Sequence, residues 1–401
     1  MVIVLSATGH FCDTRRTMNP LTTIPCARRV ARHLLVALAL LGLARVASAT
    51  EGGLPAYQPR FGRQHPVIAV VGENSGTELT DFAIPYGVLQ ASGAAEVLTV
   101  ATQPGLLRMR PVLRLKPDAT IAEFDARFPA GADYVIVPAV TKYNDPALLA
   151  WLKEQGAKGG TLVSICDGAV VVAGTGLMDG HRATAHWASE KFRRKNFRQV
   201  EWVTDVRYVA DGRIISTVGI SAALPTSLAL VEAIAGRDRA MAVATDLNVP
   251  DWSANHRTAP FRPKLGVNLK ALIMANYTNH WFYRTEMLGL NLAPGVDEIA
   301  LAITADAYSR TGRSMVHALA ASPEPIRSRR GLLIVPDTLA GSAHAMDRML
   351  PDLDRAPAGQ TLANSIEGIK LLYGRNTAYG VALDFEYPLP AAFHAKVVSL
   401  K

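Results

Sequence analysis

The stretch Thr161 to Trp187, TLVSICDGAVVVAGTGLMDGHRATAHW, decides the fold. It begins with an apolar, largely β-branched run, Leu162 to Ile165, which is typical of a buried strand. A small apolar segment, residues 169–173, follows almost at once and predicts a helix packed on a sheet. Cys166 is therefore expected at a sharp turn from strand to helix, where its side chain is exposed at the carboxyl edge of the sheet.

This position gives the thiol of Cys166 a chemical role. Backbone N–H groups and the dipole at a helix N-terminus favour an anion, so they predict a lowered thiol pKa. Serine hydrolases place their nucleophile on the same architecture. The chain has three cysteines, and Cys12 and Cys26 precede Thr50, so the remaining chain cannot form an internal disulfide. A buried structural cysteine is the alternative.

Three motifs together resemble the ThiJ/PfpI superfamily of class I glutamine-amidotransferase-like folds. They are Cys166-x-Gly-Ala, the GLMDG of residues 176–180 and the ATAHW of residues 183–187. The resemblance covers roughly residues 65–260 and is closest to the branch of isocyanide hydratases and AraC-type regulator sensor domains. It implies a doubly wound, mostly parallel (flavodoxin-like) sheet with helices on both faces. Ligand chemistry is then expected at the carboxyl edge of the strands, at the elbow.

The segment ELTDFAIPYGVL, residues 78–89, resembles the first-helix signature of that superfamily. The resemblance implies that an acidic residue reaches the cysteine, and the matching acid is Asp81, with Glu78 one turn earlier as a fallback. A carboxyl beside a thiol takes a proton as general base or hydrogen-bonds the sulfur. The alternative is a first-turn acid that only complements the helix dipole.

The sequence departs from the superfamily pattern after the apolar strand at residues 134–138. Relatives usually carry Pro-Gly-Gly there, with backbone N–H groups that help to build an oxyanion hole, whereas this chain has Pro138-Ala139-Val140. Alanine keeps the backbone donor but loses the positive-φ freedom of glycine. The N–H groups of Ala139 and Asp167 are therefore the candidate donors to a developing anion.

Asp167 and His186 bear on the class of reaction. Protease-like relatives carry His directly after the cysteine and hydratase-like ones often Thr, whereas this chain has Asp167. An acid beside the thiol opposes thiolate formation unless it is turned away or paired. This argues against a Cys-His protease and leaves hydratase chemistry open. His186 is either a catalytic base or a buried, hydrogen-bonded structural residue.

Residues 1–49 have the pattern of an export signal. Three arginines between residues 28 and 32 precede the apolar run Leu34 to Ala44, and Ala47 to Ala49 form a small-x-small cleavage site. The expected location is the periplasm or the medium. An uncleaved membrane anchor is the alternative, and Met18 is an alternative start of translation.

The charge of the chain argues against nucleic acid as a partner. Residues 1–49 hold six Arg and one Asp, so the rest has 42 − 6 = 36 basic and 34 − 1 = 33 acidic residues, a net charge of +3. That is no electrostatic footprint for nucleic acid. The His and acid residues show no ligand spacing such as His-Glu-x-x-His, so neither a metal nor another cofactor is expected.

The chain divides into a signal at 1–49, a linker at 50–65, a ThiJ/PfpI-like domain at 66–261 and a C-terminal α/β extension at 262–401. The extension shows no pair of helix-turn-helix motifs. Its GVDEIALA, from residue 295, echoes ELTDFA from residue 78, and its LLIVPD, from residue 332, echoes LRLKPD from residue 113. This indicates a degenerate copy of the front half of the fold; chance similarity is the alternative.

These observations favour an exported cysteine-dependent enzyme. The resemblance implies addition of water to a small electrophile, as in isocyanide hydration, with Cys166 as nucleophile and Asp81 as base or orienting group. A non-catalytic ligand- or redox-sensing module is the alternative from another class, followed by a cysteine peptidase or a stress chaperone-like protein. The expected partners are a small-molecule substrate or ligand and further copies of the chain.

Overall fold

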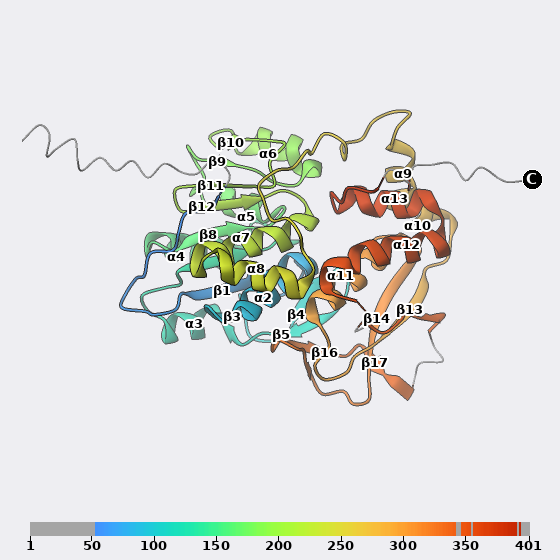
Figure 1. Cartoon of the computed structure of the whole chain (residues 1–401), viewed down its shortest axis with the longest axis horizontal. Coiled ribbons are helices and arrows are strands. Elements are labelled where there is room, and N and C mark those ends of the chain that lie inside the picture. Colours follow the sequence, from blue (N-terminus) through green and yellow to red (C-terminus); the bar gives the residue numbers. More distant parts are fainter. Residues whose placement is uncertain (1–52, 342–345, 354–355, 391–392, 394–401) are drawn as a thin grey trace, which may run out of the picture. The chain divides into compact units, whose positions relative to one another are not determined.

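The computed structural model describes residues 53–341, 346–353, 356–390 and 393. Residues 51–401 form one compact unit (Figure 1). The predicted signal, residues 1–49, and its cleavage site lie outside the described residues. The domain boundary predicted at residue 261 falls between α8 (Arg237–Leu247) and α9 (Leu269–Ile273) and stays a prediction.

The main sheet has seven strands in the order β11-β12-β8-β7-β1-β3-β6. Every neighbouring pair is parallel except β11 and β12. The strands are β1 (Val67–Gly72), β3 (Glu96–Ala101), β6 (Ala119–Thr120), β7 (Tyr134–Val137), β8 (Thr161–Ser164), β11 (Tyr208–Asp211) and β12 (Ile214–Thr217). The predicted doubly wound, mostly parallel sheet is confirmed.

Helices cover both faces of this sheet, and the alternation of side chains along β1 shows how. Ile68 and Val70 belong to the core that includes α2 (Leu79–Ser92) and α7 (Ala223–Ala235). Their neighbours Val67, Ala69 and Val71 belong to a second core under the opposite helices. Successive side chains of a strand point to opposite faces, so a strand buried on both sides reads as a continuous apolar run.

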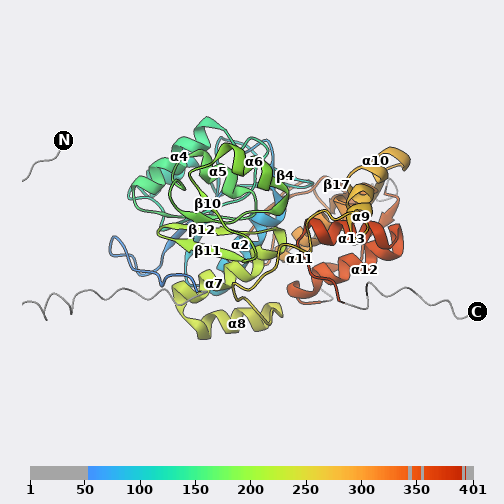
Figure 2. The same cartoon turned by 90° about the horizontal axis from the view of Figure 1, so that it is seen from above.

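The opposite face is covered by α3 (Ile121–Arg127), α4 (Pro146–Ala157) and α5 (Gly168–Gly174). Figure 2 shows α4 and α5 on one side of the strands and α7 and α8 on the other. The short strands β9 (Arg182–Ala183) and β10 (Glu201–Trp202) form a separate parallel pair, and α6 (Glu190–Asn196) lies between them in the chain.

The C-terminal part builds a second, four-stranded sheet in the order β17-β14-β13-β18. It also joins a five-stranded sheet, β15-β16-β5-β4-β2, to which both parts of the chain contribute. The strands are β2 (Thr77–Glu78), β4 (Leu107–Arg110), β5 (Arg114–Lys116), β13 (Glu286–Asn291), β14 (Ser314–Ala320), β15 (Ile326–Arg327), β16 (Leu333–Val335), β17 (Thr338–Leu339) and β18 (Arg348–Met349). The helices are α10 (Asn279–Phe282), α11 (Glu298–Ser309), α12 (Thr361–Tyr373) and α13 (Arg375–Asp384), and a π-helical turn, Met274–Thr278, links α9 to α10.

The elements of residues 286–339 follow the same order as those of residues 67–120. The series β13-α11-β14-β15-β16-β17 parallels β1-α2-β3-β4-β5-β6, and each element begins 218 or 219 residues after its counterpart. Detailed contacts recur as well. Asp118 accepts a hydrogen bond from the backbone N–H of Thr99 at 2.8 Å, and Asp337 accepts one from Ala318 at 2.9 Å.

This register differs by about two residues from the helix echo read in the sequence. The N-cap residues of the two helices are Glu78 and Asp297, so the counterpart of Asp81 is Ala300 rather than Glu298. Short runs that mix acids with small apolar residues match in more than one register, and only the hydrogen bonds of the neighbouring strands fix the alignment.

Gly87 brings α2 and α11 close together. A Cβ atom at this position would lie 2.7 Å from Cγ1 of Ile299 and 2.8 Å from Oε1 of Glu298. Around Gly341, by contrast, nothing lies within 4 Å of an added Cβ. In the described chain no helix is long and apolar enough to cross a membrane.

We expect Gly87→Val to lower the free energy of unfolding by about 1–3 kcal/mol, because the added methyl groups overpack the contact between α2 and α11. Gly341→Val is the matched control and should stay within about 0.5 kcal/mol of wild type. Urea titration followed by circular dichroism measures both. Equal midpoints for the two variants would contradict the close packing of the helices.

Candidate active site

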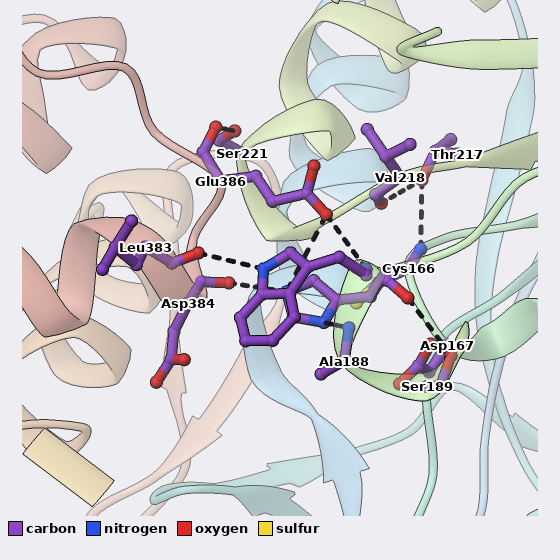
Figure 3. Close-up of polar contacts among 12 residues, drawn as sticks. Cys166, Asp167, Ala188, Ser189, Thr217, Val218, Ser221, Leu383, Asp384 and Glu386 are labelled. Carbon is purple, nitrogen blue, oxygen red and sulfur yellow. Dashed lines mark hydrogen bonds and ion pairs between the residues drawn. The ribbon is translucent and has the colours of Figure 1, made fainter. Parts of the chain in front are cut away.

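Cys166 occupies the sharp turn between β8 and α5, as the sequence predicts. Its φ of +54° lies in the left-handed region that non-glycine residues rarely adopt. The neighbouring strand holds it there, because the N–H of Cys166 donates to Oγ1 of Thr217 at 3.0 Å, and that hydroxyl donates to the carbonyl of Val218 at 3.0 Å. Figure 3 shows this chain of contacts beside the thiol. The surrounding structure thus maintains a strained residue at the candidate site.

Gly168 explains why the motif needs a glycine two residues after the cysteine. A Cβ atom at Gly168 would lie 1.9 Å from the carbonyl oxygen of Val137 on the adjacent strand β7. Any side chain would therefore push the start of α5 away from the sheet. The close approach places the first turn of the helix next to Cys166.

The thiol lies at a cavity of about 500 Å³. Cys166 itself is only 6% exposed. The cavity has an apolar part and a charged part; its lining includes Val140, Tyr143, Val170, Phe192 and Ile220 on the apolar side and Glu78, Arg110, Asn276, Arg310 and Asp384 on the polar side. A small molecule with an apolar body and one reactive polar end fits such a lining.

The electrostatic surroundings of the thiol differ from the prediction. Burial raises the pKa of Cys166 well above its usual range, and the carboxyl groups of Asp81, Asp167 and Glu78 raise it further. The backbone N–H of Asp167, which hydrogen-bonds the sulfur, opposes this rise but does not offset it. The predicted lowering of the pKa is therefore wrong, because desolvation and three nearby acids outweigh one N–H group of a seven-residue helix.

Asp81 lies in the first turn of α2 and is fully buried. Its Oδ2 accepts the N–H of Ala139 at 3.2 Å, and its Oδ1 has no hydrogen-bond partner within the described chain. Burial raises the pKa of Asp81 well above its usual range, and the neighbouring charge of Glu78 adds to the effect. At neutral pH the site therefore holds a protonated carboxyl close to a protonated thiol.

The contact with Asp81 changes the role expected for Ala139. Its N–H is engaged by the carboxyl of Asp81, so it is not free to donate to an incoming oxyanion. Its carbonyl is also used, since it accepts the N–H of Glu78 at 2.8 Å. The N–H of Asp167 remains as the donor at the sulfur.

Glu78, the fallback acid of the sequence analysis, faces the cavity and is paired with two guanidinium groups. Arg110 lies 3.3 Å from its Oε2, and Arg310 forms a short ion pair with its Oε1. Arg310 also binds Asp306 at 2.5 Å. The sequence gave no sign of Arg310, because it reaches the site from α11, far along the chain and outside any motif.

Asp306 adds a second buried acid to this cluster. Thr80 donates to its Oδ2 at 2.8 Å, and burial raises its pKa to about 7 although Arg310 lies beside it. Arg310 itself stays charged, because Asp306 and Glu78 raise its already high pKa. The cluster has more carboxyl groups than guanidinium groups, so it stores protons near neutral pH.

His186 lines the cavity, but both of its ring nitrogens are engaged. Nε2 is 2.9 Å from the carbonyl of Asp384, and Nδ1 accepts the N–H of Ala188 at 3.2 Å. These partners fix the tautomer that carries its proton on Nε2. The hydrogen bonds favour the structural interpretation of His186 over that of a catalytic base.

Asp167 is paired, as the sequence analysis required of an acid beside the thiol. Ser189 donates to its Oδ1 at 2.6 Å, and the buried guanidinium of Arg193 donates to the same hydroxyl at 2.9 Å. This side chain points to Ser189 (Figure 3). Its charge still contributes to the raised pKa of Cys166.

The end of α13 borders the site from the C-terminal part. The carbonyls of Leu383 and Asp384 accept hydrogen bonds from the segment around His186 and Trp187, and the buried carboxylate of Glu386 binds His256 at 2.8 Å. Figure 3 shows Leu383, Asp384 and Glu386 across from Cys166. Among the described residues no group of three or more His, Cys, Asp or Glu side chains is arranged to hold a metal ion.

The sequence profile of the DJ-1/PfpI family matches residues 67–233. An uncharacterized protein in the cpoL 5' region of Streptomyces lividans is 31% identical over 130 residues, which cover 31% of this chain and 88% of that protein. The chain belongs to the DJ-1/PfpI family. The matched profile ends before the C-terminal extension.

Two relatives of the DJ-1/PfpI domain carry functional names. The isonitrile hydratase of Pseudomonas putida is 28% identical over 188 residues, 45% of this chain and 79% of the hydratase. The HTH-type transcriptional regulator CdhR of Pseudomonas aeruginosa is 35% identical over 99 residues, 25% of this chain. The match spans only 29% of the length of that regulator.

We expect Cys166 to react with iodoacetamide with a pH midpoint above ~8.5, the value of a free cysteine. Asp81→Asn should move the midpoint to lower pH, because it removes a carboxyl whose charge disfavours the thiolate. Intact-mass spectrometry over a pH series follows the labelling.

Glu298→Gln is the control, since Glu298 is equally buried in the first turn of the related helix α11 but pairs with Arg330. Its midpoint should match that of wild type. Equal shifts in both variants would contradict the assignment of Asp81 to the thiol.

Proposed function

We propose that the DJ-1/PfpI domain adds water to a small electrophile, with an isocyanide as the substrate class and an N-substituted formamide as the product. The observation that carries this proposal is the protonated carboxyl of Asp81 held near the protonated thiol of Cys166 at a half-apolar cavity. The similarity to an isonitrile hydratase supports the substrate class.

The first step joins the thiol to the substrate. Asp81 gives its proton to the terminal carbon of R–N≡C, and the sulfur of Cys166 forms a bond to that carbon. The thiol proton passes to the Asp81 carboxylate, so the product is the thioimidate Cys–S–CH=N–R and Asp81 ends the step protonated. Isocyanide carbon accepts a proton before it accepts a nucleophile, so a carboxyl kept neutral by burial suits this step.

The second step consumes water. The water oxygen bonds to the thioimidate carbon, the nitrogen receives the proton of Asp81, and a water proton returns to the Asp81 carboxylate. The resulting S–CH(OH)–NH–R then breaks its C–S bond, and the hydroxyl proton returns to the sulfur through Asp81. The net reaction is R–N≡C + H₂O → R–NH–CHO. The N–H of Asp167 stabilises negative charge that develops on the sulfur.

The rest of the site positions these groups. The ion pairs of Glu78 with Arg110 and Arg310 neutralise a carboxylate that would otherwise repel charge on the sulfur. The side chains of Val140, Val170 and Phe192 provide an apolar wall for the substituent of the isocyanide. Peptidase chemistry is disfavoured, because His186 has no free nitrogen to activate the thiol.

We propose that this reaction takes place outside the cytoplasm. The basic, apolar and small-residue segments of residues 1–49 support export. Fractionation of cells that express the full chain, followed by N-terminal mass spectrometry, should find a periplasmic or secreted form that begins near Thr50.

A ligand- or redox-sensing module is the second candidate, and the low exposure and raised pKa of Cys166 favour it. A sensor would bind small apolar molecules at the cavity without turning them over. Turnover therefore separates the two candidates.

We expect the purified protein to convert aliphatic or aryl isocyanides to formamides, as followed by NMR. Cys166→Ser should abolish turnover, and Asp81→Asn should lower it by about 10²–10⁴-fold, the usual range for a general acid–base group. Glu298→Gln, remote from the cavity, should retain wild-type turnover. Binding of isocyanides without any formamide would favour the sensor instead.

A further inference from the structure

The two series of elements meet in a pattern that has the form of a twofold axis. Strands β5 and β16 pair antiparallel, with Leu115 opposite Ile334, and these two residues are counterparts 219 positions apart. On either side Arg114 lies opposite Val335 and Lys116 lies opposite Leu333. A shift of 219 residues turns each of these flanking pairs into the other. Such self-complementary pairing defines an isologous interface, normally formed by two identical subunits.

The helices α2 and α11 repeat this symmetry. Thr80 donates to Asp306, and the backbone of Gly87 approaches Ile299. With the same shift Thr80 corresponds to Ile299 and Gly87 corresponds to Asp306. The two contacts are therefore one contact seen from the two sides of the axis.

The duplication continues beyond the front half of the fold. Helices α7 and α8 are joined by Gly236 at φ +84° and ψ 166°, and α12 and α13 are joined by Gly374 at φ +83° and ψ 163°. These helix pairs are 138 residues apart and share Gly-Arg at the junction and Val-Ala one to two turns later. Each pair is followed by a left-handed residue, Asn248 at φ +55° and Glu386 at φ +52°.

The fall in spacing from 219 to 138 locates a deletion. Between β6 and the turn before α7 the first copy has residues 121–219, whereas the second copy has only residues 340–357 between β17 and the turn before α12. The first of these stretches holds strands β7 and β8, the elbow and Cys166. The second copy has thus lost the part of the fold that carries the chemistry.

A third symmetric contact joins the helix pairs. The N–H of Ser221 donates to the carbonyl of Phe385 at 2.9 Å. Its counterpart Gly359 lies so close to the carbonyl of Leu247 that a Cβ would be 2.6 Å from the oxygen. Shifted by 138 residues, Ser221 corresponds to Gly359 and Leu247 to Phe385.

An apolar cavity of about 140 Å³ lies on the same axis. Its lining consists largely of counterparts from the two copies, including Ile84 with Ile303, Leu224 with Leu362 and Val249 with Tyr387. A cavity lined by matched pairs is expected where a twofold axis passes between subunits.

We propose that this chain is a twofold dimer contained in one polypeptide, in which the second copy, residues 286–387, has lost its own site and completes the site of the first. The contribution runs one way. Arg310 pairs with Glu78 at the cavity, whereas its counterpart in the first copy is Ala91. Because the second copy has no cysteine to serve, the first copy needs no arginine at that position.

The proposal fixes the oligomeric state at this face. The surface that a second chain would use is already covered by the chain's own C-terminal part, so the protein carries one site and acts as a monomer. The homo-oligomer expected from the sequence is thereby replaced by an intramolecular partner. Arg310 is a positioning residue in this arrangement, since it acts on Cys166 through Glu78 and Asp306.

The first test is the molar mass of the full-length protein, as purified, by light scattering over a broad concentration series. We expect the mass of a single chain at every concentration. A stable two-chain mass would overturn the proposal. This measurement needs no variant, and it does not depend on turnover, so a failure of the proposed hydration leaves it intact.

The second test is the pH profile of iodoacetamide labelling at Cys166. Arg310→Met should raise the midpoint by about one pH unit, because a nearby positive charge is lost. Arg310→Lys should restore most of the effect. Arg330→Met, which removes another half-buried guanidinium of the second copy that pairs with Asp297 and Glu298, should leave the midpoint unchanged.

An unchanged midpoint in a folded Arg310→Met variant would overturn the one-way completion of the site. An equal rise in Arg330→Met would do the same, because the effect would then be general. If Arg310→Met does not fold, Arg310→Lys and the molar mass decide between the outcomes: a single-chain mass supports the proposal and a two-chain mass overturns it.

Discussion

The ion pair between Arg310 and Glu78 is the contact on which the site depends. It joins two segments 232 residues apart and lies at the wall of the cavity that holds Cys166. Without Arg310, the cluster of Glu78, Asp81 and Asp306 would bury three acids with only the half-exposed Arg110 to balance them. A buried carboxylate without a partner is costly, so the same contact holds the two copies together and sets the charge beside the thiol.

Burial gives this site an unusual protonation state. Many reactive cysteines are thiolates in electropositive surroundings, whereas Cys166 lies among acids and far from solvent. The same burial keeps Asp81 protonated. A neutral acid and a neutral thiol suit a substrate that must be protonated as it is attacked, and they suit poorly a reaction that begins with a free thiolate. The choice of isocyanide chemistry follows from this pair.

The sequence predicted what is local and missed what is assembled. The elbow at Cys166 could be predicted because a strand, a turn and a small-residue helix follow one another within a few residues, and Gly168 has a steric reason to be there. The acid Asp81 could be placed from the helix signature. The pKa of the thiol could not, since desolvation depends on everything packed around it. Arg310 could not either, because it belongs to a different copy of the fold and no motif surrounds it.

The register of the duplication was hard to read for a related reason. Helices α2 and α11 have diverged to small and apolar residues that align in several ways, while Asp118 and Asp337 keep the same backbone contact and fix the alignment. The tail helices were recognisable only once the glycine junctions at residues 236 and 374 were seen in the same conformation. Backbone geometry outlasted side-chain identity.

The difference between Ala91 and Arg310 has a consequence for how this protein can change. In a dimer of identical chains, each altered codon changes both sides of the interface at once, so a substitution that helps one role must be tolerated in the other. Here the two sides are separate codons. Each side can be adjusted alone, and residues that bind at the cavity can be exchanged on the helper copy without touching the helix that carries Asp81.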